Sequence, residues 1–267
     1  MAKNTQSSRP DATARQAKIQ AAAASSGTGG GTNKIVIAAV VAVIAIVAVV
    51  GGVVWSQLSA QKAIIGSGQE APKGASLNAG YPAFQDAKLT PGAPTVEVYE
   101  DFQCPACQQF EGVLGSTLTD LAGKGEIKLV YNTLTFLDDR LRNDGSMKAG
   151  NGAYCAADAG KFQEFHDLAY LQQPSEGTGW TSEGLKALAA QAGLSGDALT
   201  TWQKCVDGGK YVNYLKSVEA TAFGKDGIKS TPTYRINGTI VNNTDIATPD
   251  KLKAYLAKLT PSASPSS

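Results

Sequence analysis

The sequence predicts an α/β domain in which a strand–helix–strand unit and a C-terminal hairpin are separated by an all-helical insertion. A single transmembrane helix is expected before this domain. Three observations support the prediction. A strand pattern at residues 95–100 leads into Cys104-Pro105-Ala106-Cys107 and a helix. A second strand pattern covers residues 127–131, and residues 35–54 form a run of 20 uncharged residues.

The N-terminal segments predict a membrane anchor. Residues 1–34 carry five lysine or arginine residues against one aspartate, a net charge of +4, and are expected to be a disordered cytoplasmic tail. As a helix, the uncharged run would be ~30 Å long, matching the hydrocarbon of a bilayer. We therefore expect an anchor over 35–55, with Trp55 at the interface and the domain outside the cytoplasm. A signal peptide cleaved after Leu58-Ser59-Ala60 is the alternative.

Residues 56–93 are rich in glycine and proline and predict an extracytoplasmic linker. The last part, around Tyr81, Phe84 and Leu89, has side chains suited to packing on the domain. No basic patch with interleaved aromatic residues follows the tail, so nothing supports nucleic-acid binding.

The first part of the domain is expected at residues 94–139. Apolar and polar residues alternate over 95–99, as in a half-buried strand. Phe110, Val113, Leu114 and Leu118 recur at helical spacing, which predicts a helix from Cys104 to about residue 122. With the strand at 127–131, this order predicts a parallel unit with a right-handed crossover.

Cys104 and Cys107 are the predicted reactive pair. Residues three apart on a helix lie one above the other, within reach of a disulfide. Pro105 suits the first helical position, which leaves Cys104 as the cap, facing unpaired amides and the positive end of the helix dipole. These groups favour the thiolate, the reactive form of cysteine. The pattern therefore predicts a redox-active dithiol.

A zinc site and a structural disulfide are the two alternatives for the cysteine pair. Zinc needs about four ligands, and the chain offers only His166, Cys155 and Cys205 besides, with no second close pair. A purely structural disulfide would close such a short loop that it would constrain the unfolded chain little. Neither a metal nor a cofactor is predicted.

Residues 140–226 predict the helical insertion. Helical runs are expected around Ala149–Ala157, around Phe162–Leu171, and after Ser182 and Ser195 as caps, with a fifth at Tyr211–Ala222. Residues 227–260 hold the second part of the domain: strands at 233–236 and 239–241 around an Asn-Gly turn, then a helix after Pro249. Residues 261–267 are expected to be a disordered tail.

The chain resembles the DsbA-like thiol:disulfide oxidoreductases, most of all their membrane-anchored actinobacterial members. The resemblance covers about residues 90–260 and implies a thioredoxin fold with an inserted all-helical subdomain. Ser230 stands where the family often has glycine, a departure that removes no reactive group. The matching segments are residues 99–107, Phe162-Gln163-Glu164-Phe165-His166-Asp167, and 227–233 through Asn237-Gly238.

The resemblance implies further site residues. Pro232 should follow a cis peptide bond and face the cysteines, which would leave the backbone of Thr231 free to pair with an extended client. Cys155 and Cys205 should form a structural disulfide, the alternative being two buried free thiols. A quinone-linked membrane protein would reoxidise the dithiol.

Glu97, Glu100 and Asp101 are the candidate tuning carboxylates, because they precede the dithiol and one of them could accept the proton of Cys107. Solvated strand-end charges are the simpler alternative. His166 is the only histidine, and a polar residue packed within the helical subdomain explains it better than a catalytic imidazole.

The predicted function is therefore the introduction of disulfides into exported proteins that carry free thiols. A reductase or isomerase on the same fold is the first alternative. A peptide-binding module without redox chemistry is the second.

Overall fold

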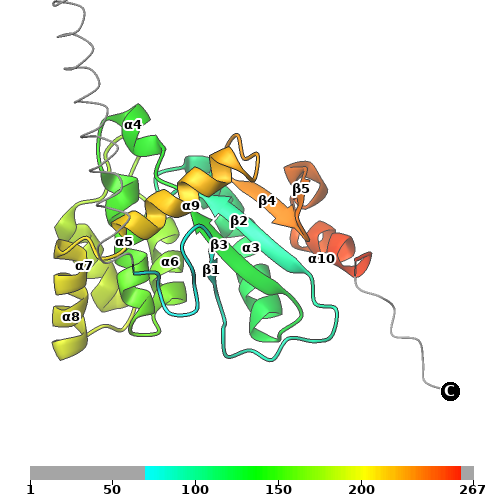
Figure 1. Ribbon diagram of the computed structural model, residues 1–267, viewed down its shortest axis with the longest axis horizontal. Coiled ribbons are helices and arrows are strands. Elements are labelled where there is room, and N and C mark those ends of the chain that lie inside the picture. Colours follow the sequence, from blue (N-terminus) through cyan, green and yellow to red (C-terminus); the bar gives the residue numbers. More distant parts are fainter. Residues whose placement is uncertain (1–69, 260–267) are drawn as a thin grey trace, which may run out of the picture. The chain divides into compact units, whose positions relative to one another are not determined.

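The computed structural model describes residues 70–259. The predicted tail 1–34, the anchor 35–55, the start of the linker and the tail 261–267 lie outside the described residues. Within residues 70–259, no helix is long and apolar enough to cross a membrane. The described part is a five-stranded mixed sheet in the order β1-β3-β2-β4-β5, with helices on both faces (Figure 1).

The centre of the sheet follows the predicted strand–helix–strand unit. Strand β2 (Thr95–Glu100) pairs in parallel with β3 (Lys128–Thr133) and antiparallel with β4 (Thr233–Ile236). This pairing confirms the predicted parallel unit. Strand β3 begins one residue later and ends two residues later than predicted, because its pairing with β2 continues to Glu100–Thr133. Strand β2 therefore ends beside the segment that carries the cysteines.

The predicted linker 56–93 is too long, because its last part belongs to the fold. Strand β1 (Tyr81–Pro82) pairs antiparallel with β3. The Tyr81 side chain is buried, with its ring 4.4 Å from that of Phe162. A two-residue strand has no periodicity that a sequence pattern can show, so only the expectation that Tyr81 packs on the domain pointed to it.

Helices cover the two faces of the sheet (Figure 1). Helix α3 (Pro105–Gly123) contacts α10 (Pro249–Ala257) on one face, and α9 (Val212–Gly224) packs against β3 on the other. Thr248 caps α10 by accepting a hydrogen bond from the Lys251 amide at 3.3 Å. Buried leucines of α3 and α9 complete the core between these layers.

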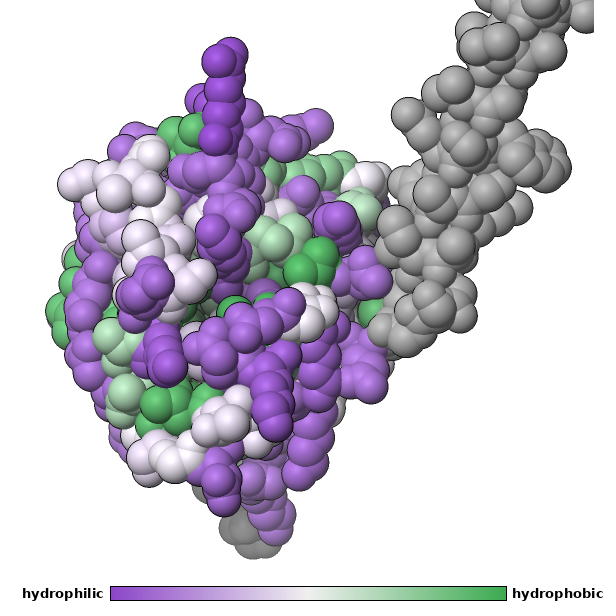
Figure 2. Space-filling view, turned by 90° about the vertical axis from the view of Figure 1, so that its left-hand side faces the viewer, coloured by the Kyte–Doolittle hydropathy of each residue, from purple (hydrophilic) through white to green (hydrophobic). Residues whose placement is uncertain are grey.

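The helical insertion begins slightly earlier than predicted, with the unexpected helix α4, and contains four of the five expected helices. The fifth, α9, packs on the sheet instead. Thr181, not Ser182, caps α7, because its hydroxyl accepts a hydrogen bond from the Gly184 amide at 3.0 Å. Hydrophilic side chains cover most of the face on which α7 and α8 lie (Figure 2). The helices are α4 (Leu137–Leu141), α5 (Gly145–Ala157), α6 (Phe162–Leu171), α7 (Ser182–Gln191) and α8 (Gly196–Asp207).

The C-terminal hairpin is confirmed. Strand β4 turns into β5 (Thr239–Val241) through Asn237 and Gly238, whose φ angles are 48° and 81°. Positive φ at both central residues is the requirement of the tight turn that Asn-Gly favours. A short 3-10 helix, Asn243–Asp245, then leads to α10.

Candidate active site

The two cysteines lie where β2 gives way to α3. Cys104 has extended backbone angles (φ −81°, ψ 114°) and caps the helix, and Pro105 takes the first helical position. The Cys107 amide donates a hydrogen bond to Cys104 Sγ at 3.3 Å. Both thiols are free, and the exposed fraction is 7% for Cys104 and 3% for Cys107. The outer sulfur is thus held by helix-start amides, and the inner one is shielded.

The two thiols have opposite pKa shifts. The Cys107 thiol and the amides of Ala106 and Cys107 lower the pKa of Cys104 to about 6, against the effect of burial. Burial, followed by the hydrogen bond to Cys104 and its charge, raises the pKa of Cys107 well above its ordinary value. Near neutral pH, Cys104 is therefore a thiolate and Cys107 a thiol. This division of roles suits thiol–disulfide exchange.

The loop before β4 faces the dithiol. The Thr231–Pro232 peptide bond is cis, and Cys104 Sγ lies 3.5 Å from the Thr231 carbonyl oxygen. Asn243 Nδ2 donates to the Pro232 carbonyl at 2.9 Å and ties this loop to the 3-10 helix. The backbone of Thr231 is thus beside the reactive sulfur.

Two side chains from the helical insertion hold the dithiol loop from the other side. Gln173 Nε2 donates to the carbonyls of Phe102 and Cys104 at 3.0 and 3.2 Å. Trp180 Nε1 also donates to the Phe102 carbonyl, at 3.4 Å. Neither residue was predicted, because nothing local to Gln173 or Trp180 indicates a partner some 70 residues away.

Asp101 has a structural role beside the site. Its buried carboxylate accepts hydrogen bonds from the amides of Gln103 and Leu137 and from the Ser146 hydroxyl. Burial raises the pKa of Asp101 to about 7, against these hydrogen bonds. Gln103 extends the network by donating to Asp138 at 2.8 Å. The network ties the dithiol loop to α4 and α5.

The carboxylate of Glu97, one of the three predicted tuning residues, is engaged in an ion pair. It is paired across the sheet with Arg235, whose Nε and Nη2 each donate to it at 2.7 Å. Arg235 also binds Asp226, at 2.8 Å. Because side chains alternate along a strand, Glu97 and Glu100 lie on opposite faces of β2. Glu97 therefore belongs to an ion-pair cluster on the α9 side.

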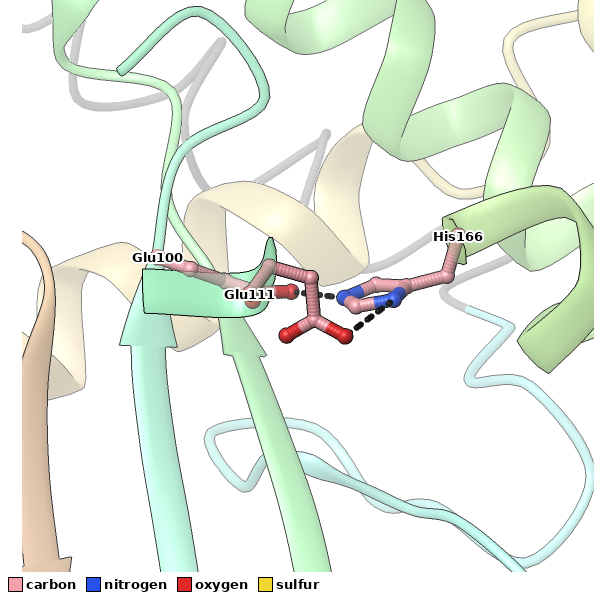
Figure 3. A group of neighbouring side chains, drawn as sticks. All are labelled: Glu100, Glu111 and His166. Atoms are coloured by element: carbon pink, nitrogen blue, oxygen red, sulfur yellow. Dashed lines mark hydrogen bonds and ion pairs between the residues drawn. The ribbon is translucent and has the colours of Figure 1, made fainter. Parts of the chain in front are cut away.

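Glu100 lies on the face that adjoins α3 and α6, where it meets His166 (Figure 3). Glu100 Oε1 is 2.9 Å from His166 Nε2, and the exposed fractions of the two side chains are 2% and 0%. Glu111 of α3 faces the other ring nitrogen, with Oε1 4.0 Å from Nδ1. The imidazole ring packs at a tilt of 44° against the Tyr131 ring, with centroids 4.4 Å apart. His166 therefore does not pack within the helical subdomain alone but joins it to β2.

The pKa values of His166 and Glu111 are both raised. Burial disfavours the charged form of His166, but the charge of Glu100 and the hydrogen bonds to Asp167 and Glu100 outweigh it and raise the pKa of His166 well above its ordinary value. Burial raises the pKa of Glu111 to about 7. His166 is thus an imidazolium between two carboxyl groups.

The geometry of these groups bears on metal binding. Glu100, Glu111 and His166 are the one cluster of three potential ligands within residues 70–259, and it does not include the cysteines. One potential ligand atom from each of the three lies within 4.8 Å of the others. The imidazole presents a different nitrogen to each carboxylate, an arrangement that suits proton exchange. Glu111 could have been found from its spacing, because it follows Cys107 by one helical turn.

Cys155 and Cys205 are joined by a disulfide that links α5 to α8 across a sequence separation of 50. These two cysteines lie within the insertion, on elements that do not carry the dithiol.

The chain is similar to known thioredoxin-fold proteins. The thioredoxin family profile matches residues 90–258. A search of curated proteins finds no match to the chain. Among solved structures, the reduced disulfide bond oxidoreductase DsbG from Mycobacterium tuberculosis is 30% identical, with a TM-score of 0.54 over 66% of this chain and 84% of that chain.

Two further solved structures are similar to the chain. Oxidised Mtb DsbA is 28% identical, with a TM-score of 0.55 over 69% of this chain and 92% of that chain. MdbA, a thiol-disulfide oxidoreductase from Actinomyces oris, is 23% identical, with a TM-score of 0.60 over 70% and 91% of the two chains. The last similarity concerns the fold alone.

Proposed function

Because the chain belongs to the thioredoxin family and is a DsbA-like thiol:disulfide oxidoreductase, we propose that it introduces disulfides into exported proteins outside the cytoplasm. The observation that carries this proposal is the lowered pKa of Cys104 at the start of α3, beside the Thr231 carbonyl. Stabilising the thiolate stabilises the reduced enzyme, and an enzyme whose reduced form is stabilised is a strong oxidant.

The reaction begins with the oxidised Cys104–Cys107 pair. A client thiolate attacks Cys104 Sγ, the Cys104–Cys107 bond breaks, and Cys107 leaves with the electron pair and takes up a proton. A second client thiolate then attacks the client sulfur of the mixed disulfide. The client gains its disulfide, and Cys104 leaves as the stabilised thiolate. In this proposal the client backbone pairs with Thr231 as an added strand.

Glu100 is the proposed proton donor and acceptor for Cys107. Glu100 is buried at the end of β2, just before the dithiol loop, and its charge is among the influences that raise the pKa of Cys107. The side chains of Glu97 and Asp101 are engaged by Arg235 and by loop amides, respectively. Glu100 alone among the three predicted carboxylates remains paired with another proton-exchanging group.

The proposed membrane anchor and reoxidising partner follow from the sequence. An anchor over residues 35–55 would hold the domain outside the cytoplasm, and a quinone-linked membrane protein would return the dithiol to the disulfide form. The linker between anchor and domain would be shorter than the sequence suggests, because β1 already belongs to the fold.

A redox titration of the full-length chain tests the proposal. We expect a potential well above that of thioredoxin, about −270 mV, and rapid oxidation of a reduced peptide that carries two cysteines. A potential near that of thioredoxin together with rapid insulin reduction would indicate a reductase instead. Unimpaired function of Cys104→Ser in cells would indicate a peptide-binding module.

A further inference from the structure

The exchange reaction requires the buried Cys107 thiol to lose its proton, but it does not itself supply a route by which that proton reaches solvent. When Cys107 attacks a mixed disulfide on Cys104, its thiol proton must leave, yet its exposed fraction is only 3% and the client covers the outer sulfur. A buried charge without compensation is costly, so the proton needs a defined acceptor and a way out. The following inference rests on the proposed function.

A series of hydrogen-bonded groups leads from Glu100, which ends β2 four residues before Cys104, toward solvent. Glu100 is 2.9 Å from His166 Nε2, and His166 Nδ1 is 3.2 Å from Asp167 Oδ1. Both residues of the first pair are buried, whereas the exposed fraction of the Asp167 side chain is 51%. The series therefore begins in the interior and ends at solvent.

The outer end opens into a cavity that the client site does not share. Asp167 lines a surface cavity of ≈ 540 Å³ together with Gln163, Tyr81 and Phe162. Gln163 Nε2 donates to Asp167 Oδ1 at 2.6 Å and fixes the carboxylate at this position. No residue of the dithiol loop or of the Thr231–Pro232 loop lines the cavity, so a bound client would leave it open.

The inner end adjoins a buried hydroxyl. Tyr170 Oη has no hydrogen-bond partner within the described part of the chain. Burial, followed by the charges of Glu100 and Cys107, raises the pKa of Tyr170 well above its ordinary value. Its ring lies 5.0 Å from that of His166.

We propose that Glu100, His166 and Asp167 form a proton path that couples each change in the redox state of the dithiol to proton release or uptake at the cavity lined by Asp167. Other ionisable groups act on this path. Glu111 faces Nδ1 at 4.0 Å, too far for a hydrogen bond. The remaining groups whose charges or hydroxyls act within the cluster are Tyr131, Tyr170, Tyr234, Asp101 and Cys107.

Each proton transfer along the proposed path has a donor and an acceptor. As the Cys107 sulfur bonds to Cys104 Sγ and the client or glutathione thiolate leaves, the Cys107 proton passes to Glu100 Oε2. The His166 imidazolium gives its Nδ1 proton to Asp167, which passes it to water in the cavity. The pair of Glu100 and His166 changes from ionic to neutral, so its net charge stays zero throughout. The reverse transfers restore the ion pair when Cys107 next leaves as a thiolate.

The single histidine gives a direct spectroscopic test. In the full-length chain labelled with ¹⁵N-histidine, we expect the ring nitrogen shifts to report imidazolium when the dithiol is reduced and neutral imidazole when it is oxidised, at the same pH. Imidazolium in both redox states, or neutral imidazole in both, overturns the coupled release.

A kinetic test uses oxidised glutathione as the probe. Mixing it with the reduced full-length chain forms glutathionylated Cys104, which Cys107 then resolves, and acid quenching followed by mass spectrometry separates the two steps. We expect Glu100→Gln to slow only the second step, by about 10²-fold at neutral pH. The rate of this step in the variant should rise with pH, because hydroxide then accepts the Cys107 proton in place of the carboxylate. Resolution at the wild-type rate and with the wild-type pH profile overturns the path.

Asp207 provides a matched control for the outer end. Asp207 is exposed on α8 and accepts from the glutamine four residues earlier at 2.9 Å, as Asp167 does on α6. We expect Asp167→Asn to slow resolution and Asp207→Asn to leave it unchanged. Equal rates for the two variants contradict the exit at Asp167. A slow first step in the wild type would instead contradict the proposed function, and with it this inference.

Discussion

At the scale of single residues, the reactivity of this site depends on what surrounds one sulfur. Cys104 Sγ accepts a hydrogen bond from the Cys107 amide at 3.3 Å. The Cys107 thiol contributes most to lowering the pKa of Cys104. The neighbouring cysteine is thus both the resolving thiol and the main stabiliser of the attacking thiolate.

A substitution at Cys107 tests this dependence. We expect Cys107→Ala to move the midpoint of Cys104 alkylation by iodoacetamide upward from about 6, because the variant loses the thiol donor but keeps the amides. Alkylation followed by mass spectrometry over a range of pH measures the midpoint. Cys107→Ser retains a donor and serves as the control. A common midpoint for the alanine and serine variants would assign the shift to the helix amides alone.

Residue roles could be predicted from the sequence only where they depend on local chain geometry. The position of Cys104 as a cap follows from Cys-Pro-x-Cys before a helical pattern, and the structure has that geometry. The role of Glu97 depends on the register that places it opposite Arg235, and no local pattern gives that register. The pairing of Glu100 with His166 joins residues 66 positions apart, so it required the folded chain.

At the scale of elements, α3 is defined by local signals and adjusted by its neighbours. Cap, proline and apolar spacing predicted its extent closely. Two glycines within it, Gly112 and Gly115, have different surroundings. A Cβ at Gly112 would meet nothing within 4 Å, whereas a Cβ at Gly115 would lie 2.1 Å from Glu111 Oε1. Gly115 thereby leaves room for the Glu111 carboxylate.

These two glycines allow a paired prediction about stability. Glycine inside a helix costs roughly 0.5–1 kcal/mol relative to alanine. We expect Gly112→Ala to raise the free energy of unfolding by about this amount. We expect a smaller gain, or none, for Gly115→Ala, because the Glu111 side chain must move. Urea denaturation of the two variants measures both effects, and an equal gain would show that the Glu111 carboxylate has no preferred position.

The elements that the sequence misplaced are those formed by distant pairing. Strand β1 exists because Tyr81 and Pro82 lie along β3, and two residues carry no periodicity. The α7 cap shifted by one residue to Thr181, since Thr181 and Ser182 are equally good caps by residue type. The Asn-Gly turn and the start of α10 at Pro249 depend on local signals, and the structure has both elements.

At the scale of the whole molecule, one covalent link joins two insertion helices. The Cys155–Cys205 disulfide closes a loop with a sequence separation of 50. In the chain-entropy model, such a loop stabilises the folded state by roughly 4 kcal/mol. We expect the double variant Cys155→Ala, Cys205→Ala to lose about this amount in urea denaturation, while the Cys104 alkylation midpoint stays unchanged. A shifted midpoint would mean that the insertion helices also position the dithiol.

The stability of the reduced molecule should depend on pH through Cys104. The folded pKa, about 6, lies below the ordinary value of about 8.5 expected in the unfolded chain. A group with a lowered folded pKa stabilises the fold fully above its unfolded pKa and loses that contribution as pH falls through its folded pKa. The stabilisation is therefore greatest above pH ~8.5 and absent below about pH 6.

Cys104→Ser isolates this contribution, because serine can also cap α3 but does not titrate in this range. We expect the free energy of unfolding of the reduced wild type, minus that of the reduced variant, to increase between pH 6 and pH 8.5 and to level off on either side. His166 and the other buried groups are present in both proteins, so their titration cancels in the difference. A difference that stays constant across this range would mean that the folded and unfolded pKa values of Cys104 are equal. The reduced form would then have no thiolate stabilisation with which to drive client oxidation.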